Sequence, residues 1–382
     1  MKKIAAMLLA GVMVLGLTAC SKPAANATSA AAATSTAATA EASKATQEAE
    51  KKAASGTQTV GIAMPTNSLE RWNRDGAYLK EQFEAAGYAT ELTYSDNDAN
   101  KQNNDIANMI AKNVDVLIIA AIDGDTLNQT LADAYDAGIP VISYDRLINS
   151  PAVSYYVSFD NYKVGELQGQ FVIDSLDLEN ATGTFNIEFT AGDPADNNAG
   201  YFFGGAYDTL TPYIESGVLK IPSGKNTFEQ VATPSWDTAK AMENMQNTLA
   251  SFYSNGTVLD VALCSNDSTA AGVVQAIGSD YAGKNQVIVT GQDGDIANLK
   301  NIVDGKQTMT VYKNVSDEAG VTLVLATAIL NGETPDSKLL DSFTCEAAFD
   351  TESYFTDAGP VPSYLLVPWV VTKDNLQDLV DT

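Results

Sequence analysis

The chain has 382 residues, with 22 Lys and Arg against 48 Asp and Glu, and a formal net charge of −26. Such an acidic chain is unsuited to nucleic acid, which is bound by basic patches. Histidine is absent, which excludes Ser-His-Asp and Cys-His catalysis and most zinc sites. Acidic residues are plentiful enough to supply a catalytic carboxylate pair, so composition alone does not exclude an enzyme.

The first twenty residues are typical of an export signal. Lys2 and Lys3 precede an apolar run at residues 4–17, which is shorter than the ~20 apolar residues that span a bilayer. The run ends in Leu-Thr-Ala-Cys at 17–20, which resembles the lipobox of bacterial lipoproteins and implies that Cys20 becomes the lipidated first residue. A plain secretory signal with an incidental cysteine is the alternative. We expect an extracytoplasmic chain, anchored by lipid to the cell membrane at a Gram-positive surface or in the periplasm.

Residues 21–58 contain no aromatic side chain and are rich in Ala, Ser, Thr, Lys and Glu. This composition cannot bury a core and predicts a linker. Residues 59–382 are enough for two domains. Besides Cys20 the chain has Cys264, in an apolar run that predicts burial, and Cys345. A disulfide between them stays open, because sequence does not fix the geometry.

After the linker, short apolar runs alternate with helical patterns. In the first half we expect strands at 60–64, 89–94, 114–121 and 140–144, and helices at 72–86, 100–112 and 126–137. The continuous apolar run at 114–121 predicts a strand buried on both faces. This alternation is typical of a doubly wound parallel sheet.

The second half repeats the pattern. We expect strands at 185–189, 258–264, 287–290 and 308–312, and helices at 199–213, 237–252, 268–277 and 295–303. Parallel sheets bind ligands just beyond the carboxyl ends of their strands. Two such α/β domains facing each other would form the walls of one cleft.

Polar residues follow several of these strands. They are Asp145, Arg146, Asn266, Asp267, Gln292, Asp293 and Lys313. Sugar hydroxyls both donate and accept hydrogen bonds, so carboxylates beside Arg, Lys and Asn suit a polyhydroxylated ligand. Trp72 and Trp236 are candidates to cover the apolar face of a sugar ring. Helix caps, surface ion pairs and core packing are the structural alternatives for these residues.

An ordered set of short motifs carries a specific resemblance. The motifs are Met64-Pro65-Thr66, Glu70-Arg71-Trp72, Tyr144-Asp145-Arg146, Ser158-Phe159-Asp160-Asn161, Val164-Gly165, Asp196-Asn197-Asn198-Ala199, Ser265-Asn266-Asp267, Gly291-Gln292-Asp293, Val311-Tyr312-Lys313 and Val361-Pro362-Ser363-Tyr364-Leu365-Leu366. From about residue 60 to 375 the chain resembles the monosaccharide-binding proteins of bacterial ABC importers, in their xylose-binding and multiple-sugar-binding branch. Residues 342–359 depart from that pattern as a longer, more aromatic connection.

The resemblance implies a type I periplasmic-binding-protein fold, in which two Rossmann-like domains are joined by a three-segment hinge. It implies an N-terminal domain of 59–162 plus 312–345, and a C-terminal domain of 163–311 plus 346–382. From the first domain, Arg71, Asp145 and Arg146 would hydrogen-bond the sugar and Trp72 would stack on it. The sugar ligands implied for the second domain are Asn197, Trp236, Asn266, Asp293 and Lys313.

The implied function is capture of an aldose, such as xylose or glucose, by hinge closure, followed by delivery to an ABC permease. We expect a monomer that is not an enzyme, needs no cofactor and meets the membrane only through its lipid. A chemoreceptor or sensor-kinase partner using the same site is the alternative, and a sugar-processing enzyme is a third reading. The sequence shows no metal signature, because the calcium-like start at 96–100 has Lys101 where the loop needs Gly.

Overall fold

The computed structural model describes residues 56–380, and contacts join the chain from Thr57 onward into one compact unit. The expected export signal, the lipidated Cys20 and nearly all of the expected linker lie outside the described residues. Among residues 56–380, no helix combines the length and the apolar character that crossing a membrane requires.

The first lobe is built on a seven-stranded sheet in the order β11-β14-β5-β4-β3-β1-β2. Its strands are β1 (Thr59–Met64), β2 (Ala89–Tyr94), β3 (Val116–Ile119), β4 (Val141–Tyr144), β5 (Val153–Phe159), β11 (Ala347–Asp350) and β14 (Ser363–Leu366). Neighbouring strands are parallel, except that β11 is antiparallel to β14. Every residue of β3 is buried, which explains the unbroken apolar run in the sequence.

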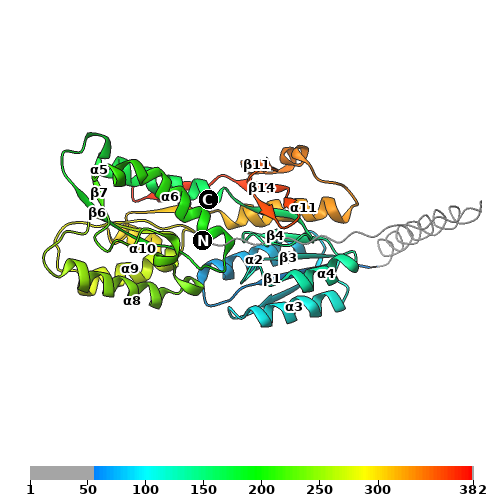
Figure 1. The fold of residues 1–382 in the computed structure, drawn as a ribbon. Helices are drawn as coiled ribbons and strands as arrows, with labels where there is room; N and C mark the ends of the chain where they lie inside the picture. The colour runs from blue at the N-terminus through cyan, green and yellow to red at the C-terminus, as the bar shows by residue number, and fades with distance from the viewer. Residues whose placement is uncertain (1–55, 381–382) are drawn as a thin grey trace, which may run out of the picture. The chain divides into compact units, whose positions relative to one another are not determined.

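Helices cover both faces of this sheet (Figure 1). One core includes side chains from α2 (Glu70–Ala85) and α11 (Val315–Leu330), and the other includes side chains from α3 (Ala99–Ala111) and α4 (Asn128–Asp136). β1 contributes Ile62 to the first core and Ala63 to the second, because successive side chains of a strand point to opposite faces.

The second lobe has a four-stranded parallel sheet in the order β7-β6-β8-β9. Its strands are β6 (Phe185–Thr190), β7 (Leu219–Lys220), β8 (Val261–Cys264) and β9 (Ile288–Val289). α5 (Asn161–Leu176) and α6 (Asn197–Glu215) pack on one side, and α8 (Thr238–Thr248) and α9 (Asp267–Asp280) on the other. β10 (Met309–Tyr312) pairs antiparallel with β15 (Trp369–Thr372).

Shorter elements complete the described chain. They are α7 (Phe228–Val231), α10 (Ile296–Val303), α12 (Gln377–Val380), the hairpin strands β12 (Phe355–Thr356) and β13 (Gly359–Pro360), 3-10 turns at Leu178–Asn180, Pro234–Trp236 and Ser337–Ser342, and a π-helical turn at Leu249–Tyr253. The chain passes between the lobes three times: from β5 to α5, from β10 to α11 and from β14 to β15. The expected pair of doubly wound α/β domains is confirmed.

One domain boundary differs from the expectation. We assigned residues 346–382 to the second domain, but β11 and β14 belong to the sheet of the first lobe, and only β15 pairs in the second. β14 is fully buried and pairs parallel with β5, so it extends the first sheet at its edge. The boundary that the resemblance implies at residue 346 therefore lies too early in the chain, which returns to the second lobe only after β14.

Both described cysteines are free thiols, so the disulfide that the sequence left open does not form. Cys264 is buried in the core of the second lobe, as its apolar neighbours predict. Cys345 is half-buried, and burial raises the pKa of its thiol to about 11.

Candidate binding site

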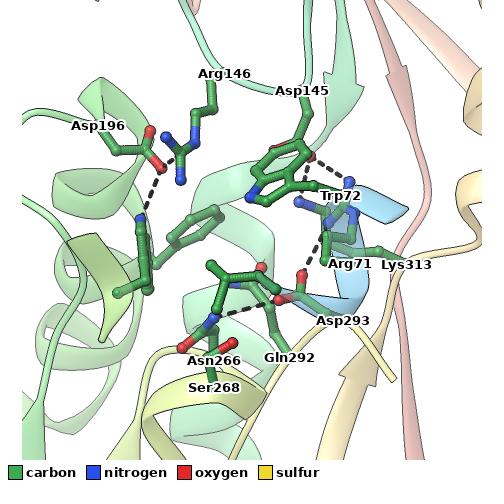
Figure 2. Close-up of a pocket in the computed structure, with 13 residues that line it drawn as sticks. Arg71, Trp72, Asp145, Arg146, Asp196, Asn266, Ser268, Gln292, Asp293 and Lys313 are labelled. Carbon is green, nitrogen blue, oxygen red and sulfur yellow. Dashed lines mark hydrogen bonds and ion pairs between the residues drawn. The ribbon is translucent and has the colours of Figure 1, made fainter. Parts of the chain in front are cut away.

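Polar side chains that follow strands of both lobes converge on one cavity (Figure 2). Asp145 follows β4 in the first lobe, whereas Asn266 comes after β8 and Lys313 after β10 in the second. The cavity is lined by Leu69, Arg71, Trp72, Asp145, Arg146, Asp196, Phe202, Trp236, Asn266, Ser268, Gln292, Asp293 and Lys313. It therefore lies where doubly wound sheets bind ligands, beyond the carboxyl ends of their strands.

Eight of the nine side chains that the resemblance implies as sugar ligands line this cavity: Arg71, Trp72, Asp145, Arg146, Trp236, Asn266, Asp293 and Lys313. Asn197 does not. It is the first residue of α6, and its Nδ2 donates to the Leu147 carbonyl at 3.1 Å. The preceding residue, Asp196, lines the cavity instead.

Arg71 is the hub of the site. Its Nε donates to Asp75 Oδ2 at 2.7 Å, and its Nη2 donates to Asp145 Oδ2 at 2.7 Å and to Glu318 Oε2 at 2.9 Å. Its Nη1 crosses to the second lobe and donates to Asp293 Oδ1 at 2.9 Å. One guanidinium thus joins carboxyl groups of both lobes, and its planar, forked donors suit this task.

The charges at the hub are tightly coupled. Burial alone would raise the pKa of Asp145, but the charges of Arg71 and Lys313 outweigh it and hold that pKa well below its usual value. Lys313 Nζ lies 2.7 Å from Asp145 Oδ2. The pKa of Arg71 is raised well above its usual value, because its acidic neighbours outweigh the opposing effect of burial. Asp145 is therefore an anion that can accept hydrogen bonds.

Arg146 lies on the opposite side of the cavity from this hub (Figure 2). Its Nη1 donates to the Ala121 carbonyl at 2.9 Å, and its Nε lies 3.2 Å from Asp196 Oδ2. The same oxygen accepts a hydrogen bond from Trp236 Nε1 at 3.2 Å. Burial raises the pKa of Asp196, and the charge of Arg146 opposes that rise.

Aromatic rings supply the apolar part of the wall. The Trp72 ring lies near two guanidinium groups, with its centre 5.4 Å from the Arg71 carbon and 4.9 Å from that of Arg146. Trp236 packs edge-on against Phe202, with 6.2 Å between ring centres. Both indoles are almost fully buried, and each exposes an edge or face to the cavity.

Four residues at the cavity or beside it have left-handed backbones. Positive φ angles occur at Asp145 (55°), Ser235 (60°), Trp236 (53°) and Asp293 (101°). Such conformations are costly for residues other than glycine and concentrate at functional sites. Three of these strained residues, Asp145, Trp236 and Asp293, have side chains that line the cavity.

Five lining residues are not among the ligands that the resemblance implies: Leu69, Asp196, Phe202, Ser268 and Gln292. Of these, only Gln292 is among the polar residues that follow predicted strands. Asp196 and Gln292 stand beside predicted residues in the quoted motifs, and that adjacency was the available signal. Gln292 Oε1 is buried and has no hydrogen-bond partner among the described residues, so it is an acceptor free for a ligand. Leu69 and Phe202 are apolar, and nothing in their local sequence separates them from core residues.

The cavity can recognise a neutral, hydroxyl-rich ring. The carboxylates and the Gln292 carbonyl can accept hydrogen bonds from it, and the guanidinium, ammonium and amide groups can donate hydrogen bonds to it. The indole rings can cover the C–H surfaces of the ring. Asn266 and Asp196 have a second role, because each caps a helix by accepting from backbone N–H groups of α9 and α6 respectively. At these two positions, capping a helix and lining the cavity are therefore compatible.

Comparison with known proteins places this site in context. Residues 60–334 match the family described as "Periplasmic binding protein domain". The chain is 42% identical over 331 residues to the multiple sugar-binding periplasmic receptor ChvE of Rhizobium radiobacter, covering 86% of this chain and 90% of the relative. It is 34% identical over 322 residues to the D-xylose-binding periplasmic protein of Escherichia coli K12, covering 84% and 88%.

A solved structure gives the same result. The ABC transporter solute-binding protein of Clostridium phytofermentans, with bound β-D-glucose, superposes with a TM-score of 0.79 at 47% sequence identity, covering 85% of this chain and 96% of that one. These relatives are receptors and binding proteins, which confirms the expectation that the chain is not an enzyme.

Proposed function

The chain belongs to the periplasmic binding protein family, and we propose that it captures a monosaccharide between its lobes and delivers it to an ABC permease. The observation that carries the proposal is the mixed wall of the cavity. Charged acceptors and donors from both lobes surround it together with two indole rings. Neutral sugars need this combination, because their hydroxyls are polar and their ring faces are not.

Capture is coupled to hinge closure. Asn266 and Asp293 approach the cavity from the second lobe and Arg71 from the first, so a sugar held by all three favours the closed arrangement. Its binding then shifts the population from open to closed forms. The permease would then bind the closed form.

The sugar we propose is an aldose. The relatives named above include a D-xylose-binding protein and a solute-binding protein with bound β-D-glucose. Lipidation of Cys20 would keep the protein at the membrane surface beside its permease, as the resemblance of residues 17–20 to a lipobox implies.

A thermal-shift screen tests the function. The melting temperature of the purified protein is recorded with each of six sugars: xylose, glucose, galactose, arabinose, ribose and fructose. A bound sugar stabilises the folded protein by mass action, by about 2.7 kcal/mol at a free concentration of one hundred times its Kd. This stabilisation raises the melting temperature. At least one aldose should raise it in a concentration-dependent way. No shift with any sugar would contradict the proposal.

Replacing Arg146 with Ala sharpens the test. The variant removes a charged donor from the cavity and leaves Asp196 without its ion-pair partner. We expect sugar affinity to fall by about 2–4 kcal/mol, measured by calorimetry. Lys163→Ala is the control, because Lys163 is exposed and pairs with Glu166 on the surface of α5. Unchanged affinity in Arg146→Ala would refute the assignment of the cavity.

A further inference from the structure

Arg71 and Lys313 stand among more acids than they can neutralise. Within hydrogen-bond or ion-pair distance of these two cations lie four carboxyl groups, those of Asp75, Asp145, Asp293 and Glu318. All six side chains are less than one-tenth exposed. If every acid were ionised, the cluster would carry a buried net charge of −2, which is strongly unfavourable in a low-dielectric interior.

Burial raises the pKa of both Asp75 and Glu318, but their hydrogen bonds differ. Both oxygens of Asp75 accept, from Arg71 Nε at 2.7 Å and from the Tyr144 hydroxyl at 2.6 Å. Asp145 accepts from two cations at 2.7 Å each. Glu318 accepts only at Oε2, and its Oε1 is buried without a partner among the described residues. An unpartnered oxygen suits a protonated carboxyl far better than a carboxylate.

The groups around Glu318 point the same way. It faces Arg71 and Asp75 from α2, Tyr144 and Asp145 from β4 and its end, and Lys313 after β10. Burial and then the charge of Asp145 raise the pKa of Glu318 well above its usual value, with Asp75 adding to the rise and Arg71 and Lys313 opposing it.

We propose that Glu318 is a positioning residue that acts as a neutral acid: it holds Arg71 through one oxygen without adding a further negative charge to the site. This deepens the proposed function, on which it rests, because Arg71 is one of the cationic donors that line the cavity. Glu318 does not line the cavity. Closure brings Asp293 to Arg71 and adds another negative charge, so the closed form tolerates an ionised Glu318 less well than an open form does. Sugar affinity should therefore fall as the pH rises.

Two variants test whether Glu318 is a neutral acid or a carboxylate. Glu318→Gln keeps the shape of the neutral acid, whereas Asp75→Asn removes the charge of a group whose two oxygens both accept hydrogen bonds. D-glucose and D-xylose are titrated into each protein by calorimetry from about pH 6 to pH 9. We expect Glu318→Gln to bind within about threefold of the wild type at pH 6, and Asp75→Asn to lose about tenfold or more. The wild-type affinity should weaken across the range, and that of Glu318→Gln should stay flat.

A ligand-free measurement keeps the test independent of the sugar. An acid whose pKa is higher in the folded than in the unfolded protein stabilises less as the pH rises through that interval. In urea unfolding, Glu318→Gln should gain stability relative to the wild type between about pH 5 and pH 9. The inference is overturned if Glu318→Gln fails to fold, binds as weakly as Asp75→Asn, or gains no relative stability at high pH. If no sugar of the thermal-shift screen binds the wild type, the proposed function fails, while the urea series still decides the protonation of Glu318.

Discussion

Trp236 can lie against the cavity only because residue 192 has no side chain. A Cβ at Gly192 would come within 2.0 Å of Trp236 Cη2 and 2.1 Å of its Cζ2. Trp236 itself has a left-handed backbone, and its Nε1 is fixed by Asp196. The indole ring thus packs directly against Gly192, and its N–H is fixed by a hydrogen bond to Asp196.

Gly192→Ala should displace this indole. Overpacking of this kind costs about 1–3 kcal/mol of stability, and a shifted Trp236 should weaken sugar binding measured by calorimetry. Gly183→Ala is the matched control, because a Cβ there would meet no atom within 4 Å. If the two variants bind sugar equally well, the packing of Gly192 does not set the position of the indole.

Sequence motifs identified most of the site because its polar residues directly follow strands or begin helices. The one implied ligand that does not line the cavity, Asn197, is next in sequence to Asp196, which does. Asn197 and Asp196 are neighbours at the start of α6, and each residue of a helix turns about 100° from the last. A motif names the segment that reaches a cavity, but only the helix geometry decides which of two adjacent side chains faces it.

At the scale of elements, the connection between β11 and β14 is anchored by Tyr354. Its ring packs between Tyr156 of β5, at 5.1 Å, and Tyr201 of α6, at 5.3 Å. Its hydroxyl accepts a hydrogen bond from the backbone N–H of Asn161, the first residue of α5. The aromatic segment that departed from the family pattern therefore packs where the chain first crosses from one lobe to the other.

Removing this anchor should destabilise the fold. Tyr354→Ala should cost about 3–5 kcal/mol of unfolding free energy, as deletion of a buried aromatic ring does. Tyr354→Phe keeps the ring but leaves the Asn161 N–H unpaired, which should cost about 1–3 kcal/mol. Phe355→Ala is the control, because that side chain is 54% exposed and surface changes stay within about 0.5 kcal/mol. Urea unfolding gives all three values, and equal losses at residues 354 and 355 would contradict the anchor.

The helices and strands predicted from the sequence match the structure where the local sequence pattern alone determines the element. The strand at 89–94 has the expected bounds, and the helix expected at 72–86 is α2, Glu70–Ala85. The pattern did not reveal β5 and α5, because the mixed polar and aromatic sequence of 153–176 has neither clean alternation nor a clear apolar stripe. The sheet to which β14 belongs depends on long-range pairing, which no local window contains.

Across the whole molecule, a second set of contacts joins the lobes outside the cavity. Arg74 of α2 donates to the carbonyls of Gly294 and Asp293, at 3.0 and 3.2 Å, and to Asp295 Oδ1 at 3.1 Å. Glu70 Oε1 accepts from the N–H of Ile296 at 2.9 Å, at the start of α10. These contacts hold the two lobes together independently of any sugar in the cavity.

These contacts make stability depend on pH. Burial, and then the charge of Asp293, raise the pKa of Asp295 to about 7, although Arg74 opposes the rise. The folded protein therefore retains a proton that the unfolded chain releases near pH 4, so stability falls as the pH rises from about 4 to 7. Asp295→Asn should remove this fall, gaining about 1–4 kcal/mol relative to the wild type between pH 5 and pH 8 in urea unfolding. Parallel curves for both proteins would contradict the expectation, and Asp304→Asn, on the exposed surface, is the control.

The acid-rich hub around Arg71 also determines which ligands are rejected. Its cations are already matched by carboxyl groups of both lobes, so a uronate or a sugar phosphate would bring its own anion to a place with no spare positive charge. Such compounds resemble neutral aldoses in most of their hydroxyl pattern. We therefore expect the site to discriminate against charged sugars as well as against neutral sugars of the wrong stereochemistry.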